Sequence, residues 1–93
     1  MNFYKSKAWK NKQKIILRRD EYLCQECKRY GKSVKADTVH HIIPILEDNT
    51  KRLDSKNLIS LCANCHNKMH NRSTGELSGK GLELKNRKYP PTS

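Results

Sequence analysis

The chain has 93 residues, 34% of them hydrophobic, with one Trp, four Tyr and one Phe. A chain this short forms a single domain with a small core, so we expect a metal or disulfides to stabilise it. No apolar run reaches the roughly 20 residues that span a bilayer, and the first residues lack the apolar stretch of a signal peptide. We therefore exclude a multi-domain enzyme and expect a cytoplasmic protein without a membrane partner.

The charge of the chain is strongly positive. Lys and Arg number 20 against 9 Asp and Glu, which gives a formal net charge of +11. The positive electrostatic field of such a chain attracts polyanions. Nucleic acid is therefore favoured as the partner over anionic lipid, and over a surface that is charged only for solubility. Charge alone carries no sequence specificity, so it identifies the class of partner and not a target site.

Residues 5–19 are expected to form a basic, amphipathic helix. Ser6 can accept a backbone N–H bond at its start. Trp9, Ile16 and Leu23 recur every seven residues and give the segment one apolar face. The remaining positions are mostly Lys and Arg, which form either a solvated face or a surface that contacts a nucleic-acid backbone.

The middle of the chain predicts two strands followed by a short helix. Residues 38–43 are rich in β-branched side chains and end at Pro44, which cannot donate to a strand ladder. After a polar loop over residues 45–56, residues 58–61 form the second strand, and residues 63–71 form the helix. A small α+β fold follows from this order.

The last part of the chain offers little to bury. It contains several glycines and ends in Tyr-Pro-Pro-Thr-Ser. We therefore expect a domain over residues 1–72 and a flexible or loosely docked basic tail over residues 73–93.

Four cysteines form two C-x-x-C pairs. Each pair, Cys24 with Cys27 and Cys62 with Cys65, can direct both sulfurs at one ion, so together they predict a structural four-cysteine zinc site. Redox chemistry would need a βαβ pattern, and a haem site at the C-x-x-C-H string would leave the first pair unexplained. A zinc site made of Cys62, Cys65, His66 and His70 is disfavoured, because its adjacent residues, Cys65 and His66, would point about 100° apart on a helix and could not easily bind the same ion.

All four histidines lie between positions 40 and 70, which suggests a second metal site. His66 and His70 lie on one face of the expected helix. His40 and His41 interrupt an apolar strand, and burying them without partners would cost free energy. Strand neighbours point to opposite faces, so either the strand breaks here or the two histidines have different roles.

These motifs together resemble the HNH endonuclease family. The similarity covers residues 24–27, 39–44 and 54–66, and the preceding helix, with Trp9 ahead of residues 16–20, also resembles the corresponding part of small phage and bacterial members. It implies a ββα-metal fold in which two antiparallel strands and a helix hold one divalent ion beside zinc knuckles. The activity implied is hydrolysis of DNA phosphodiester bonds to 5′-phosphate and 3′-hydroxyl ends.

The resemblance also assigns roles to individual residues. His41 corresponds to the general base, and Asn57 corresponds to the catalytic-motif Asn that braces the loop between the strands. His40 and His66 correspond to ligands of the catalytic ion, and His70 matches a further ligand found in part of the family. The positive charge, and not the resemblance, supplies the candidate phosphate contacts, which are Lys10, Lys14, Arg18, Lys51, Arg52, Lys56 and Lys68.

The expected cofactors are a structural Zn²⁺ and a catalytic divalent ion. Imidazole ligands suit Ni²⁺, Zn²⁺ or Mn²⁺ better than Mg²⁺, which prefers oxygen. DNA is the expected partner, and a larger phage DNA-packaging or processing protein is a further candidate. The alternative hypothesis is a non-catalytic zinc-knuckle module that binds nucleic acid, which would have no use for the histidines.

Overall fold

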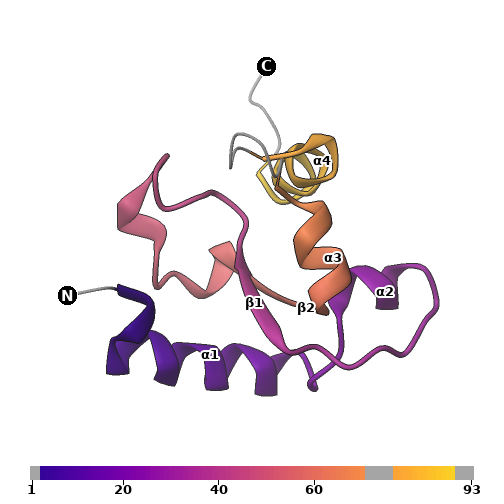
Figure 1. Cartoon of the computed structure of the whole chain (residues 1–93), viewed down its shortest axis with the longest axis horizontal. Helices are drawn as coiled ribbons and strands as arrows, with labels where there is room; N and C mark the ends of the chain where they lie inside the picture. The colour runs from indigo at the N-terminus through magenta and orange to yellow at the C-terminus, as the bar shows by residue number, and fades with distance from the viewer. Residues whose placement is uncertain (1–2, 71–76, 90–93) are drawn as a thin grey trace.

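Two short antiparallel strands lie at the centre of the molecule. The computed structural model describes residues 3–70 and 77–89. Strand β1 (Thr38–His41) pairs with β2 (Leu58–Leu61), and His40 lies opposite Ile59. Helix α1 (Lys7–Arg19) runs along one side of the strands, and α3 (Ala63–Lys68) with α4 (Gly79–Lys88) lies on the other (Figure 1). The sequence of β1, β2 and α3 is the expected ββα arrangement, so the predicted fold class is confirmed.

Helix α1 forms where the apolar repeat predicts it. The Ser6 hydroxyl accepts a hydrogen bond from the Trp9 N–H at 3.2 Å and caps the helix. Trp9 and Ile16 are buried and pack against Val39 and Leu58 of the two strands. A single 3-10 turn, η1 (Phe3–Lys5), precedes the helix and brings further aromatic rings beside Trp9.

A charged pair fixes the end of α1 to β2. The Asp20 carboxylate accepts hydrogen bonds from Arg19 Nε at 2.8 Å and from the Ser60 N–H at 3.0 Å. Arg19 also donates to the carbonyls of Ser55 at 2.9 Å and Leu58 at 2.8 Å. Burial raises the pKa of Asp20, but the bonds from Arg19 and Ser60 outweigh it, so the pKa is lower than usual. The ionised carboxylate therefore holds the helix against the edge of the sheet.

Three short helical turns occupy the connecting segments. Helix α2 (Gln25–Arg29) follows the first cysteine, Cys24, whose Sγ accepts a hydrogen bond from the Cys27 N–H at 3.4 Å and caps the helix. The polar loop between the strands contains η2 (Asn49–Lys51) and η3 (Ser55–Asn57), capped by the carboxylates of Asp48 and Asp54. These caps satisfy backbone N–H groups that would otherwise lack partners so close to the sheet.

Part of the expected tail is a docked helix. Leu84 of α4 is 1% exposed and belongs to a core cluster with Met69. Arg87 donates to Glu26 of α2 at 3.1 Å, which connects α4 to the first cysteine pair. Gly81 is buried, and its backbone lies directly against the Met69 carbonyl. The glycine that suggested flexibility is therefore a close-packing position.

Other parts of the expected tail, residues 73–76 and 90–93, lie outside the described residues. The domain boundary at residue 72 stays a prediction. Among the helices in the described ranges, none has the length and apolar character that a membrane crossing requires.

Candidate active site

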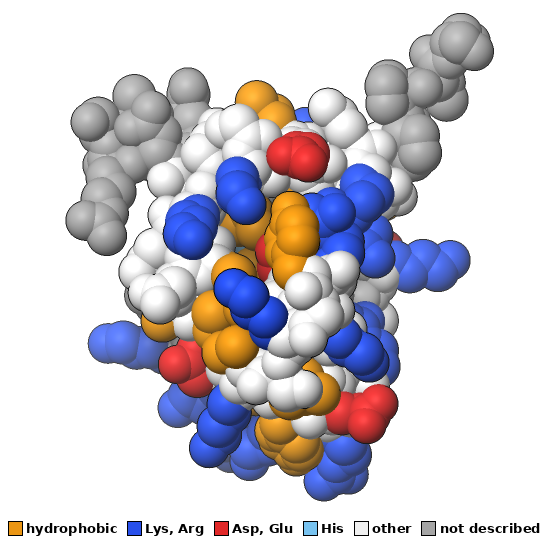
Figure 2. All heavy atoms as spheres, turned by 90° about the vertical axis from the view of Figure 1, so that its right-hand side faces the viewer, with side chains coloured by type: hydrophobic (Ala, Val, Ile, Leu, Met, Phe, Trp, Pro, Cys, Tyr) orange, Lys and Arg blue, Asp and Glu red, His pale blue; other side chains and the backbone are white. Residues whose placement is uncertain are grey.

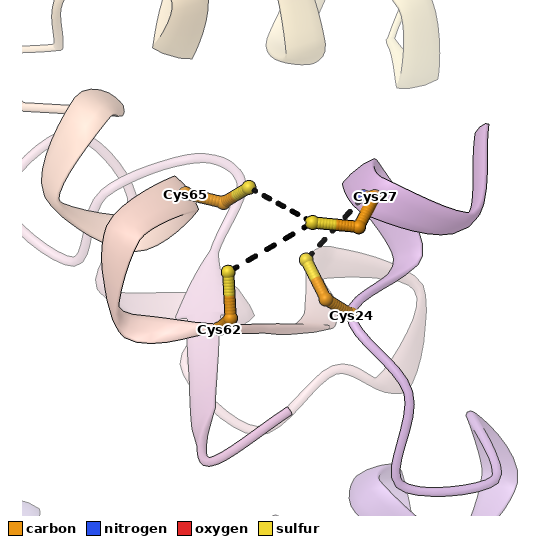
Figure 3. Close-up of side chains that lie close together, drawn as sticks. All are labelled: Cys24, Cys27, Cys62 and Cys65. Atoms are coloured by element: carbon orange, nitrogen blue, oxygen red, sulfur yellow. Dashed lines mark hydrogen bonds between the residues drawn. The ribbon is translucent and has the colours of Figure 1, made fainter. Parts of the chain in front are cut away.

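The four cysteines lie together between α2 and α3 (Figure 3). Cys27 Sγ is 3.9 Å from Cys62 Sγ and 3.6 Å from Cys65 Sγ, and all four are free thiols. A tetrahedral zinc with Zn–S bonds of about 2.3 Å requires sulfurs about 3.8 Å apart. Burial and the neighbouring cysteines raise the pKa of Cys65, and a bound cation would reverse this shift by stabilising the thiolates. The geometry therefore fits the expected structural zinc.

A second cluster contains three histidines. His40 of β1 and His66 and His70, on or directly after α3, have ring centroids 5.2 to 5.5 Å apart. One ring nitrogen of each lies within 4.8 Å of the others. This cluster is distinct from the cysteines, so the mixed set of Cys62, Cys65, His66 and His70 does not form.

The chemistry of His40 fits a metal ligand. Its side chain is 1% exposed, and its Nε2 atom has no hydrogen-bond partner within the described part of the chain. Burial, followed by the proximity of His66 and His70, lowers the pKa of His40 to about 3, so the ring is neutral at pH 7. A buried nitrogen without a partner costs free energy, and a divalent ion bound by the three imidazoles would provide the partner.

His41 faces the opposite side of β1. Its pairing with Leu58 continues the regular ladder, so the strand does not break between the two histidines. The imidazole stacks on Trp9 at 4.7 Å between ring centroids and 20° between planes. Its Nε2 lies 2.9 Å from the Arg52 carbonyl oxygen. Because a carbonyl can only accept, Nε2 is the donor, and Nδ1 of the neutral ring is left unprotonated.

The environment of His41 favours this neutral state. Burial lowers its pKa, and the hydrogen bond to Arg52 only partly opposes the shift. A pocket of about 390 Å³ is lined by His41 together with His40, His66 and His70. The pocket therefore combines a possible metal site with an imidazole that can accept a proton.

Asn57 joins the two ends of the loop between the strands. Its Oδ1 accepts from the Ile43 N–H at 2.7 Å, and its Nδ2 donates to the carbonyls of Ile43 at 3.1 Å and Lys51 at 3.2 Å. The side chain is fully buried. Lys51 directly precedes Arg52, so these bonds help to place the carbonyl that holds His41.

The basic residues expected to contact phosphate lie outside this pocket. Lys14 and Arg18 line a hollow on α1, Lys56 lines another beside η3, and Lys68 lies near the cysteines. Arg52 donates to the Asn49 carbonyl at 3.1 Å. Lys10 is exposed on α1, and Lys51 is half-buried beside an aromatic ring. Figure 2 shows Lys and Arg spread widely over one face of the molecule.

The pocket contains residues that the sequence did not single out. Tyr4, Gln13 and Leu46 line it beside the histidines. Trp9 was identified only as a core residue, although it also stacks on His41. The aromatic pair at positions 3 and 4 is the sequence feature that could have indicated further aromatic rings near this pocket.

Comparisons with known proteins agree with this arrangement. Residues 24–72 match the HNH endonuclease family. The chain is 31% identical over 86 residues to a "Probable HNH endonuclease" of Lactococcus phage SK1, covering 88% of this chain and 86% of that relative. It is also similar to the crystal structure of the HNH endonuclease of the deep-sea thermophilic bacteriophage GVE2 with manganese ion. The TM-score is 0.68 and the identity 48%, over 70% of this chain and 71% of that one. Because the family match spans both strands and both ligand clusters, the chain belongs to the HNH endonuclease family and is a metal-binding nuclease that acts on nucleic acid.

Proposed function

We propose that this protein hydrolyses DNA phosphodiester bonds with His41 as the general base. The observation that supports this most strongly is the position of His41. It shares a pocket with the histidine cluster, and its Nε2 faces the Arg52 carbonyl, so Nδ1 remains to accept a proton. The stacked Trp9 ring fixes the plane of the imidazole. A neutral imidazole is suited to general-base catalysis near pH 7.

In the proposed reaction, His41 accepts one proton. Nδ1 takes it from a water molecule, whose oxygen attacks phosphorus while the bond to the 3′ oxygen breaks. The 3′ oxygen takes a proton from solvent, which leaves 5′-phosphate and 3′-hydroxyl ends. A divalent ion held by His40, His66 and His70 would supply charge stabilisation at the phosphate and the leaving oxygen. Asn57 acts as a positioning residue through the loop that carries Arg52.

The proposed ions follow from the ligand atoms. Four thiolates favour Zn²⁺ at the structural site. Three imidazoles favour Mn²⁺, Ni²⁺ or Zn²⁺ over Mg²⁺ at the other site, and the related phage structure with manganese makes Mn²⁺ the first ion to test.

The proposed setting is phage DNA processing or restriction in the host cytoplasm. The similarity to phage proteins supports this setting. The seven basic residues expected to contact phosphate would hold the DNA backbone around the pocket. A larger DNA-packaging or processing protein is the partner class that this setting implies.

The test is cleavage of supercoiled plasmid with a panel of divalent ions, with and without EDTA. We expect nicked or linear product with at least one ion and none with EDTA. His41→Gln should cut about 10²- to 10⁴-fold more slowly, which is the usual contribution of a general base. Leu82→Ala, an exposed change on α4, is the matched control. If His41→Gln cuts as fast as the parent, the general-base role is wrong. If the parent binds DNA but never cuts it, the non-catalytic zinc-knuckle hypothesis is favoured.

A further inference from the structure

The part of the histidine pocket wall that the structure describes carries no Lys, Arg, Asp or Glu side chain, and its titratable groups are four imidazoles and one phenol. Aromatic and aliphatic side chains predominate, and Gln13 and Thr38 add polar atoms. The atoms of a substrate on either side of the reacting phosphate would therefore meet apolar surfaces and not cations.

Two exposed apolar side chains form the rim of this pocket. Tyr4 is 54% exposed and Leu46 is 100% exposed, and both line the pocket. The Tyr4 ring is edge-on to His41, with centroids 6.2 Å apart and planes at 78°. Single exposed apolar residues are common on protein surfaces, but these two line the same pocket as the proposed general base.

Leu46 is held at the tip of a hydrogen-bonded turn. The Pro44 carbonyl accepts from the N–H groups of Glu47 at 2.9 Å and Asp48 at 3.1 Å. The Glu47 carboxylate also lies 3.3 Å from Lys85 Nζ of α4, which attaches the turn to the body of the protein. The backbone of Leu46 is therefore held in an ordered turn, so a contact made by Leu46 loses ordering free energy for the side chain and not for the backbone.

We propose that Tyr4 and Leu46 contact a nucleobase beside the scissile phosphate, and that the enzyme prefers DNA in which this base is unpaired or unstacked. The inference rests on the proposed function. In a regular duplex both faces of a base are covered by its neighbours, so an aromatic or apolar rim can reach a face only when the base leaves the stack. Bulged, mismatched or single-stranded DNA loses less stacking and pairing free energy than a paired duplex when it does so.

The experiment compares three end-labelled DNA substrates of the same sequence: a fully paired duplex, a duplex with a central bulge, and the single strand. Cleavage with Mn²⁺ is followed on denaturing gels. We expect the wild-type protein to cut the bulged and single-stranded DNA at least about tenfold faster than the paired duplex, with cuts at the bulge. Tyr4→Ala should slow cleavage of the bulged and single-stranded DNA roughly five- to hundredfold, the range of a base-stacking contact, and should slow cleavage of the paired duplex much less. Leu46→Ala should slow cleavage of the same two substrates about tenfold.

Tyr30→Ala and Leu82→Ala are matched controls, because these side chains are 58% and 46% exposed and do not line the pocket. We expect both controls to keep the wild-type preference. The inference is overturned if the wild-type protein cuts all three substrates at similar rates, or if the rim variants slow every substrate equally. If no substrate is cut with any ion, the proposed function itself fails, and the inference fails with it.

Discussion

Two glycines in α4 allow a direct test of how this helix is docked. Gly81 is buried, and a Cβ there would overlap the Met69 carbonyl and lie 2.8 Å from Leu77 Cδ2. Gly79, at the start of the same helix, has nothing within 4 Å of the equivalent position. Neither residue has the positive backbone angle that would exclude alanine. Helix propensity alone would therefore predict that alanine stabilises the protein at both sites.

The structure predicts opposite results for the two substitutions. Gly79→Ala should stabilise by about 0.4–1 kcal/mol, because it removes freedom from the unfolded chain. Gly81→Ala gains at most about 1 kcal/mol in the same way, but the overlapped atom is backbone, so its overpacking cost lies in the upper part of the usual range, about 2–3 kcal/mol, which leaves a net destabilisation of at least about 1–2 kcal/mol. For a domain of this size, that corresponds to a Tm lower by roughly 4–16 °C.

The assay is thermal unfolding by circular dichroism at a fixed zinc concentration. Met69 directly precedes His70, so Gly81→Ala should also weaken ion binding at the histidine cluster. A Gly81→Ala protein with a Tm equal to or above that of the parent would refute the close packing of α4. A loss of stability in Gly79→Ala would show that the helix start has an unrecognised constraint.

Three further predictions concern the loop, an ion pair and the basic helix. Asn57→Ala should lower the free energy of unfolding in urea by about 1–3 kcal/mol or more, because it leaves buried backbone groups unpaired; Asn57→Asp, which keeps the acceptor but turns a buried carboxylate oxygen toward the carbonyls of Ile43 and Lys51, should lose at least as much at neutral pH, and an Asn57→Asp protein as stable as the parent would contradict this account. The pKa of Glu26 is lowered, because hydrogen bonds from Arg29 and Arg87 outweigh burial, which raises it. The ionised Glu26 carboxylate therefore contributes to the free energy of unfolding above about pH 4.5, and this contribution is lost as the pH falls further. The difference in Tm between the parent and Glu26→Gln should therefore shrink in acid, and a difference that stays constant would argue against the ion pair. Lys14→Gln should weaken DNA binding and lower the slope of log affinity against log salt by about 0.9 if Lys14 contacts a phosphate; an unchanged slope would remove it from the interface.

The local elements could be predicted because their signals lie within short stretches of chain. The Ser6 cap and the seven-residue apolar repeat identify α1, and the apolar run after Asn57 gives β2 with its observed bounds. The two C-x-x-C pairs predicted a four-cysteine cluster, because each pair is a local motif and the two pairs together can bind one zinc ion.

The different environments of His40 and His41 required the tertiary structure. Strand alternation left open whether the strand breaks at these histidines, and it could not identify which of them would meet α3; only the family resemblance grouped His40 with His66. The packing of α1 against β1 decides this, because Trp9 occupies the face of His41 and leaves His40 to the other two histidines.

Helix α4 was not expected, because its sequence signals conflict. Gly79 and Gly81 lower helix propensity, and Leu82 and Leu84 are the two large apolar residues among mostly polar ones. The helix is stabilised by contacts with distant parts of the chain, including the core around Met69 and the ion pair of Arg87 with Glu26. Such long-range contacts leave no local pattern in the sequence.

Metal content per chain tests the central claim most directly. The account requires two separate sites, one made by cysteines and one by His40, His66 and His70. We expect elemental analysis of protein saturated with Zn²⁺ and Mn²⁺ to give two ions per chain, and His66→Ala to lose one ion while it keeps a tightly bound zinc and the fold. One ion per chain at saturation in the parent, or two ions in His66→Ala, would contradict the account.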